Sequence, residues 1–325
     1  MRIAFVVNDR REPTVEQTTT LLICAALRRG HDVLVCGVGD LTCNDDGRLF
    51  ANGSKPNESD RFALTRELAT STASRHPLDD YELLIIRTNP GRDESRRSQH
   101  LAALRMLESM QERGARIVNS PRGLLRSLTK LSLLDLPASL RPRTFVTRDA
   151  DAIEELLDQE SERLVIKPLD GSRGRDVFVL GPTDSRANVK QIIEVVLRQG
   201  YAMVQTFVPG AERGDVRVTV LDGEIVELDG RAAAVARVPG KHDFRSNLHA
   251  GGTAEAVEVT DAMREAVALI APYLDREGLV HVGVDFVGGR ILEMNVFSPG
   301  GIYPSECLYS RDFSGAIIEA LERRV

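Results

Sequence analysis

Three oxygen-bearing side chains stand close together near the C-terminal end of the chain, within a stretch that is otherwise apolar. Asp285, Glu293 and Asn295 belong to residues 281–301, HVGVDFVGGRILEMNVFSPGG, a pattern of two short strands joined at a Gly-Gly pair. Burying such side chains is costly unless a positive charge meets them. Carboxylate and amide oxygens suit Mg²⁺, which completes its octahedron with water and phosphate oxygens. The alternative is a solvent-facing hairpin whose charges only keep it soluble.

The register of this hairpin decides whether the three side chains can share one ligand. Side chains alternate between the two faces of a strand, so a slip of one residue reverses them. A simple two-residue turn would pair Asp285 with Leu292 and direct Glu293 away. A three-residue or bulged connection sets Asp285 opposite Glu293, with Asn295 on the same face. We predict the second arrangement. We also expect that exchange of either carboxylate for its amide lowers turnover and spares thermal stability.

Two lysines are unusual because the chain uses arginine almost everywhere else. Only five of its 42 basic residues are lysines, and Lys130 and Lys167 lie beside apolar runs. A lysine ammonium is a compact point charge, unlike the planar guanidinium. Lys167 ends a buried strand, and a loop with Gly171 and Gly174 follows it. Backbone N–H groups of such a loop can surround phosphate oxygens. The pattern therefore predicts a phosphate site.

Three further stretches are candidates for binding. Arg87 follows a strand predicted over residues 81–86, and ligands of open α/β sheets bind at such strand ends. It could hold a substrate carboxylate, although an arginine there is more often a surface ion-pair partner. Residues 204–210, VQTFVPG, suit a flat adenine or ordinary core packing. Residues 237–252 form a long irregular segment rich in polar donors, and such segments tend to be functional or disordered.

The elements that must position these residues begin with a β-α-β pattern. Residues 2–7 and 32–36 predict buried strands and residues 15–29 a helix, which together indicate a parallel sheet covered by helices. The first turn lacks the G-x-G-x-x-G of a Rossmann dinucleotide site. Residues 42–80 are polar and predict irregular or partly mobile structure. Residues 120–136 predict one amphipathic helix that includes Lys130, and Thr260 predicts the cap of a helix over 260–276.

Composition limits the class of protein. With 325 residues and 42% hydrophobic content, the chain can form two or three domains. It has no run of about 18 apolar residues and no signal-peptide pattern, so we expect a cytoplasmic protein with no membrane partner. The net charge of −6 argues against nucleic acid as a partner. The four cysteines lack metal-ligand spacing, which is typical of a reducing compartment.

Several long motifs in one order resemble those of prokaryotic glutathione synthetase, a member of the ATP-grasp superfamily. They include IVNSPRGLLRSLTKL, VIKPLDGSRG, VPGAERGDVRV, ARVPGKHDFRSNLHAGG and GLVHVGVDFVGGRILEMNVFSPGGI. The resemblance implies an ATP-grasp fold of the α/β class with an α+β lid. Its expected parts are an N-terminal parallel-sheet α/β domain over residues 1–120, a central lid over 121–203 and a C-terminal antiparallel-sheet domain over 204–325.

The resemblance also implies an activity. Members of the family are ATP-dependent ligases that join a carboxylate to an amine through an acyl phosphate and release ADP. We therefore expect ATP and Mg²⁺ as cofactors, with two metal ions and Mn²⁺ as the alternative metal. The expected partners are a small-molecule carboxylate and amine, and a second copy of the chain in a dimer or tetramer.

Matching the motifs residue by residue assigns expected roles. Lys130, Lys167, Gly171, Ser172, Gly174, Gln205, Phe207, Val208 and Asp215 match nucleotide-binding positions, and Asp285, Glu293 and Asn295 match the metal ligands. Arg217 and Arg237 match arginines that face the phosphates and the reacting carboxylate, and we assign them to catalysis. The expected substrate residues are Arg87, Arg245, Asn247, Gly251, Gly252, Ser298, Gly300 and Gly301.

The chain departs from the family pattern in four places, two of which are residues 87–91, RTNPG, where the family reads R-K-D-P-P, and Thr253, where it often has Arg. The phosphate loop, commonly G-M-G-G-R-G, is GSRGRD over residues 171–176, and the resemblance assigns no role to Arg173 and Arg175. After the hairpin the family reads N-V-T-S-P-T-G-I-R-E, whereas Phe297, Tyr303 and Pro304 stand in this chain. The nucleotide half therefore matches better than the substrate half.

Three functions are consistent with these patterns. The first is synthesis of glutathione from γ-glutamylcysteine and glycine. The second is a related amino-acid or peptide ligase of a specialised pathway with another donor or acceptor. The third is a non-catalytic ATP-binding module, which would have no need to keep a complete Mg²⁺ ligand set.

Overall fold

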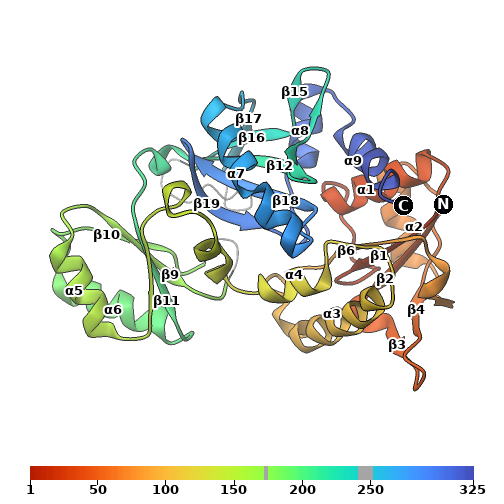
Figure 1. Cartoon of the computed structure of the whole chain (residues 1–325), viewed down its shortest axis with the longest axis horizontal. Coiled ribbons are helices and arrows are strands. Elements are labelled where there is room, and N and C mark those ends of the chain that lie inside the picture. Colours follow the sequence, from red (N-terminus) through yellow and green to blue (C-terminus); the bar gives the residue numbers. More distant parts are fainter. Residues whose placement is uncertain (172–174, 241–251) are drawn as a thin grey trace.

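The N-terminal part of the chain forms a parallel sheet with helices on both faces. The computed structural model describes residues 1–171, 175–240 and 252–325 (Figure 1). The strands follow the order β2-β1-β6-β7, and all their pairings are parallel. Alternate side chains of the strands face opposite cores, one shared with α1 and the other with α3. The bounds are β1 Arg2–Val7, α1 Thr18–Arg28, β2 Asp32–Gly37, β6 Leu83–Arg87, α3 Arg97–Glu112 and β7 Ile117–Val118.

The polar stretch over residues 42–80 is regular, so the prediction of irregular structure there was wrong. It contains β3 (Leu41–Cys43), β4 (Leu49–Gly53) and β5 (Ser74–Pro77), which form a three-stranded sheet, and α2 (Arg61–Thr70). The carboxylate of Asp60 caps α2 by accepting hydrogen bonds from two backbone N–H groups. The strands are short and largely exposed on one face, so they show little of the apolar pattern that identifies a strand.

The middle of the chain forms a separate antiparallel sheet of order β10-β9-β11-β8. Helices α5 and α6 share a core with one face of this sheet (Figure 1). In β9 the buried side chains of Leu164 and Ile166 face these helices, and Val165 and Lys167 lie on the other face. The bounds are β8 Thr144–Thr147, α5 Ala150–Gln159, β9 Leu164–Pro168, β10 Phe178–Leu180, α6 Arg186–Leu197 and β11 Ala202–Thr206.

The third large sheet contains the predicted hairpin. It has the order β17-β16-β12-β18-β19, with β13 (Glu224–Ile225) paired to β12, and its pairings are antiparallel. Helix α7 (Asp261–Glu277) packs against it, and Thr260 caps α7 as predicted by accepting a hydrogen bond from the N–H of Met263. The bounds are β12 Asp215–Leu221, β16 Ala234–Val238, β17 Thr253–Glu255, β18 His281–Val287 and β19 Arg290–Asn295.

The predicted helix over residues 120–136 is broken, which corrects that expectation. Helix α4 (Pro121–Arg126) ends before Thr129, and a 3-10 segment (Lys130–Asp135) follows. The side-chain oxygen of Thr129 accepts a hydrogen bond from the N–H of Leu131, so it starts a new helical segment. Lys130 therefore occupies the first position of that segment.

The C-terminal helices return to the N-terminal sheet. Helix α9 (Phe313–Glu322) packs against α1, and both termini of the chain lie on this side of the molecule (Figure 1). Phe313 and Ile317 share a core with Phe5 and Leu22. In the sequence, α8 (Ile302–Tyr309) lies between the hairpin and α9. The predicted domain boundaries stay a prediction. Among the described residues, no helix is both long and apolar enough to cross a membrane.

Candidate active site where two cavities meet

The hairpin of β18 and β19 has the predicted register. Asp285 pairs with Glu293, and Gly283 pairs with Asn295, so the three polar side chains share one face. The turn itself has two residues, because Val287 pairs with Arg290. The register shifts beyond Phe286, which pairs with Ile291, and leaves Leu292 as the extra residue of a β-bulge. The bulge, and not a longer turn, brings the three side chains together.

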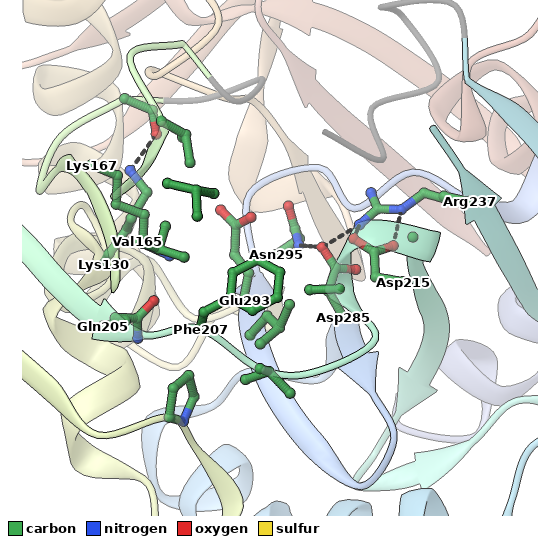
Figure 2. Close-up of a pocket in the computed structure, with 18 of the residues that line it drawn as sticks. Lys130, Val165, Lys167, Gln205, Phe207, Asp215, Arg237, Asp285, Glu293 and Asn295 are labelled. Carbon is green, nitrogen blue, oxygen red and sulfur yellow. Dashed lines mark hydrogen bonds and ion pairs between the residues drawn. The ribbon is translucent and has the colours of Figure 1, made fainter. Parts of the chain in front are cut away.

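Asp285 is buried, and the positively charged side chains of two arginines contact it. The residue is 2% exposed, and Arg217 holds both carboxylate oxygens through Nε and Nη2 at 2.5 and 2.7 Å. Nη2 of Arg237 lies 2.7 Å from Oδ2, and the amide of Asn295 donates to the same oxygen at 3.1 Å (Figure 2). Burial would raise the pKa of Asp285, but the two guanidinium charges outweigh it and hold the pKa below its usual range.

A second ion pair lies beside the first. Arg237 donates to both oxygens of Asp215 at 2.6 and 2.7 Å. The two are cross-strand neighbours in β12 and β16, as Arg217 and Asp285 are in β12 and β18. Gly214 allows this close approach, because it has φ +113° and a Cβ there would lie 2.0 Å from the carbonyl oxygen of Arg237. Register alone therefore places four charged side chains on one face of the sheet.

Lysine side chains face this sheet across a cavity of about 240 Å³, which we call the smaller cavity to distinguish it from the adjoining cavity of about 700 Å³. Lys167 approaches from β9 of the middle sheet and Lys130 from the 3-10 segment Lys130–Asp135, and Glu293 extends from β19 between them and Asp285 (Figure 2). Glu293 makes no hydrogen bond or ion pair within the described part of the chain. Burial lowers the pKa of Lys167 to about 8, against the opposing attraction of Glu293. Burial also lowers the pKa of Lys130.

Lys130 holds the start of the phosphate loop. Its ammonium donates to the carbonyl oxygens of Pro168, Leu169 and Gly171 at 3.1, 3.4 and 2.8 Å. Its N–H groups are therefore directed at backbone oxygens where β9 ends. Lys167 has no such bonds among the described residues, and of the two lysines it is the better placed to meet an anion in the smaller cavity.

The other end of the smaller cavity is apolar. Its wall includes Val165, Val179, Phe207, Val208 and Leu292. A slot of this kind suits a flat base. Sequence reasoning predicted Phe207 and Val208 there and missed the other three. Val165 was predictable, because it precedes Lys167 by two residues in the same strand and so lies on the same face of the sheet.

Gln205, Gly171 and Asp215 also belong to the predicted nucleotide set and line the smaller cavity. Gln205 lines the smaller cavity and its amide donates to the hydroxyl of Thr144 at 2.9 Å. Gly171 lines the same cavity and has φ +133°, where a side chain would be strained. The predicted residues Ser172, Gly174, Arg245, Asn247 and Gly251, and also Arg173, lie outside the described residues.

A larger cavity of about 700 Å³ adjoins the smaller one. Asn89, Arg92, Arg217 and Arg237 line both, so the two cavities meet at these residues. The predicted substrate residues Arg87, Gly252, Ser298, Gly300 and Gly301 line the larger cavity. Tyr303 and Pro304, where the chain departs from the family pattern, line it too.

Arg87 lines the larger cavity and is 4% exposed. Its Nε donates to the hydroxyl of Thr19 at 3.1 Å, and its Nη2 donates to the carbonyl oxygen of Pro299 at 2.8 Å. Burial, together with the charge of Arg92, lowers the pKa of Arg87 to about 9. It is therefore not the exposed surface residue that an arginine at a strand end usually is.

Asn119 positions the hairpin. Its role was not predicted from the sequence. It is 4% exposed, its amide donates to the carbonyl oxygens of His281 and Val296 at 2.8 and 2.9 Å, and its oxygen accepts from the N–H of His281 at 2.7 Å. One side chain thus links the start of β18 to the end of β19. No local sequence pattern around Asn119 predicts its contacts with His281 and Val296.

The hairpin residues fit a hard divalent cation on the chemistry of their donors. Two carboxylates and an amide oxygen share one face, and Glu293 is exposed toward the cavity. No group of three or more His, Cys, Asp or Glu side chains in the described ranges could hold a metal. Two protein carboxylates suffice for Mg²⁺ when phosphate oxygens and water supply the remaining ligands.

Both parts of the chain match the models of one protein family. Residues 1–125 match the N-terminal domain of prokaryotic glutathione synthetase, and residues 129–308 match its ATP-grasp domain. The glutathione synthetase of Synechococcus elongatus is 33% identical over 335 residues, which cover 100% of this chain and 99% of that protein. The glutathione synthetase of Vibrio vulnificus (strain YJ016) is 35% identical over 310 residues, which cover 94% and 91%.

Solved structures share the fold at lower identity. D-cycloserine synthetase matches with a TM-score of 0.66 at 19% identity, covering 99% of both chains. The VanG D-Ala:D-Ser ligase from Enterococcus faecalis matches with a TM-score of 0.62 at 14% identity, covering 100% of this chain and 99% of that one. Together with the family match, these likenesses confirm the expected ATP-grasp fold.

Proposed function

Because this chain belongs to the prokaryotic glutathione synthetase family and is an ATP-dependent, ADP-forming carbon–nitrogen ligase, we propose that the smaller cavity binds ATP and the larger one its two substrates. The observation that supports this division is the position of Arg217 and Arg237, which line both cavities. A carboxylate held at these residues would lie beside the terminal phosphate, as in-line transfer requires. The third function, a non-catalytic binding module, is therefore set aside.

The residues of the smaller cavity have distinct tasks in this proposal. Lys167 neutralises phosphate charge, and Lys130 holds the phosphate loop in place through its carbonyls. The apolar slot around Phe207 takes the adenine, with Gln205 at its edge. Asp215 keeps Arg237 oriented toward the junction of the cavities.

The chain uses ATP with a divalent metal, as its family does, and we propose Asp285, Glu293 and Asn295 as the metal's protein ligands. The metal is proposed to be Mg²⁺, as two ions, with Mn²⁺ as the alternative. When bound, it would neutralise charge on the transferred phosphoryl group. Asp285 can meet a cation only if it loosens its bonds to Arg217 and Arg237, which frees their N–H groups for the phosphate and the carboxylate.

For the substrates we propose γ-glutamylcysteine and glycine, because the relatives of more than 30% identity are glutathione synthetases. A second candidate is a peptide ligase with another donor or acceptor. The observation that favours it is the wall of the larger cavity, where Tyr303 and Pro304 replace the Arg and Glu of the family pattern.

One assay tests both candidates. ADP release is measured with ATP and Mg²⁺ in the presence of γ-glutamylcysteine and glycine, each alone and together, and then with a panel of amino acids and dipeptides. A ligase releases ADP well above background only when carboxylate and amine are both present. Efficient glutathione formation would remove the second candidate, and a better rate with another pair would remove the first.

Two further properties are proposed from the family resemblance alone. They are a homodimer or homotetramer and a cytoplasmic location. Analytical ultracentrifugation of the purified protein tests the first, and fractionation of the source cells tests the second.

A further inference from the structure

The turn after β19, residues 296–299, is held by side chains that come from the N-terminal sheet. The amide of Asn119 donates to the carbonyl oxygen of Val296 at 2.9 Å, and the amide of Asn89 donates to that of Phe297 at 3.3 Å. Asn119 directly follows β7, and Asn89 lies two residues after the neighbouring strand β6. Both donors therefore stand at the carboxyl ends of adjacent parallel strands.

A third donor fixes the other end of the turn. Nη2 of Arg87, the last residue of β6, donates to the carbonyl oxygen of Pro299 at 2.8 Å. Between the bonded carbonyls, Ser298 has φ +46°, in the left-handed region that residues other than glycine rarely adopt. Such a conformation costs free energy and persists only where its surroundings hold it in place. The three hydrogen bonds hold the turn in this way.

The turn is continuous with two groups of the proposed active site. It begins directly after Asn295, whose amide donates to Oδ2 of Asp285 at 3.1 Å (Figure 2). At its other end Pro299 packs over Gly283, the strand partner of Asn295. A Cβ at Gly283 would lie 3.3 Å from Cβ of Pro299 and 3.1 Å from Cδ of Arg217. A shift of the turn would therefore reach Asn295 through the chain and Arg217 through this contact.

We propose that Asn89 is a positioning residue for the metal ligand Asn295. The inference rests on the proposed function, in which Asn295 is a ligand of the divalent cation, and it adds a residue that keeps this ligand in place. Asn89 is itself held on two sides. Its N–H donates to Oδ1 of Asn8 at 2.8 Å, and its Oδ1 accepts from the N–H of Gly91 at 3.0 Å. Its amide is thus a fixed point of the N-terminal sheet to which the end of β19 is bonded.

Asn89 is also the donor whose removal disturbs the fold least. Asn119 bonds both backbone groups of His281, and Arg87 is buried, so the loss of either would alter more than the turn. Asn89 is half-buried and lines both cavities. The carbonyl group that it holds lies only two residues after Asn295. Groups that orient a metal ligand influence metal affinity even though they do not touch the metal.

Asn89→Ala is the direct test, with Mn²⁺ as the probe. Binding of Mn²⁺ to the protein with ADP present is measured by electron paramagnetic resonance. We expect the affinity for Mn²⁺ to fall about fivefold, the scale of one hydrogen bond, because the end of β19 is then less firmly placed. The affinity for ADP without metal should not change. A loss of metal-free ADP binding would mean that Asn89 contacts the nucleotide itself, and would overturn the inference.

Gln111→Ala is the matched control. The amide of Gln111 donates to the carbonyl oxygen of Ile117, also at 3.3 Å, and its oxygen accepts from the hydroxyl of Ser120 at 2.8 Å. It thus has one donated and one accepted bond, as the side chain of Asn89 has. Among the described residues that line the two cavities, Gln111 does not occur. Its variant should bind Mn²⁺ as wild type does, even where its melting temperature falls as far as that of Asn89→Ala.

A double-mutant cycle with Asn295→Ala shows whether Asn89 acts through the ligand. Asn89→Ala should weaken Mn²⁺ binding in the wild-type background and have no further effect in the Asn295→Ala protein. An equal loss in both backgrounds would overturn the inference, and so would an Asn89→Ala protein with wild-type Mn²⁺ affinity. If Asn295→Ala alone leaves Mn²⁺ affinity unchanged, the proposed ligand set is wrong and the inference falls with it. These results do not depend on which substrates the enzyme joins.

Discussion

The two cavities differ in how their charges are balanced. In the smaller one, Asp285 and Asp215 are matched by Arg217 and Arg237 through cross-strand pairs within a single sheet. In the larger one, Arg87 is buried with no acidic partner among the described residues. The first arrangement is complete within the fold, whereas the second needs an anion from outside. The comparison indicates that the Asp–Arg pairs form before any ligand binds, whereas the guanidinium of Arg87 still lacks an anionic partner.

The cavities also differ in the elements that build them. Residues of the smaller cavity come mainly from strands of the middle and third sheets, where register fixes their positions. The larger cavity is lined by strand ends, a helix N-terminus and the turn after β19. Loops and element ends tolerate substitution more easily than paired strands. Substrate choice can therefore change in the larger cavity while the nucleotide chemistry stays fixed.

The largest effect is expected at Asp285. Asp285→Asn leaves two buried guanidinium groups without their shared carboxylate, so we expect a loss of about 3–5 kcal/mol in the free energy of unfolding as well as loss of turnover. Glu293→Gln should abolish turnover with an unchanged melting temperature, because Glu293 has no ion pair within the described chain. Calorimetric melting and ADP release measure both. Equal stability of the two variants would contradict this contrast.

This prediction revises the one made from the sequence, which treated the two carboxylates alike. Periodicity placed them on one face but gave no information about Arg217 and Arg237, whose partners depend on the order of strands in the sheet. The amide exchange that spares the fold at Glu293 therefore does not do so at Asp285.

Lys167→Ala should affect one cavity only. Without its ammonium, we expect ATP affinity to fall about 100-fold, the scale of losing a charged group aimed at a phosphate. Binding of the substrate carboxylate should be preserved, because Lys167 does not line the larger cavity. Lys190→Ala is the control, since Lys190 is exposed and paired only loosely with Glu154 at 3.7 Å. Calorimetry with a non-hydrolysable ATP analogue measures both, and an equal loss in the two variants would refute the assignment.

ATP binding should also depend on pH through Lys167. Its pKa is lowered to about 8, chiefly by burial, and bound phosphate favours the ammonium form. ATP affinity therefore falls as pH rises through about 8, and binding there takes up a proton. For the ligand-free fold, the contribution of Lys167 to stability is present at high pH and is lost as pH falls through about 8. Calorimetry in buffers of different ionisation enthalpy counts the proton, and Lys167→Ala should abolish its uptake.

The sequence predicted much of the smaller cavity because its pattern is local. The hairpin register followed from three polar side chains that had to share a face, and Lys167 was identified by its place at a strand end. The contacts of Asn119 with His281 and of Arg87 with Pro299 span 162 and 212 residues. Periodicity carries no information about such distant contacts. The segments 172–174 and 241–251, which include five predicted site residues, lie outside the described chain.

The smallest effect is expected from restoring the family pattern in the larger cavity. Tyr303→Arg with Pro304→Glu replaces an aromatic and an apolar wall residue by a basic and an acidic one. Arg61 lies 5.0 Å from the ring of Tyr303, so Tyr303→Arg alone would bring two like charges together, and the added Glu offsets this repulsion. If these residues set substrate choice, the double variant should raise kcat/KM for γ-glutamylcysteine and glycine a few-fold, equivalent to about 1 kcal/mol. KM for ATP should not change, because neither residue lines the smaller cavity. A double variant that keeps its melting temperature but shows no preference for this pair would indicate that substrate choice is set by other residues of the larger cavity.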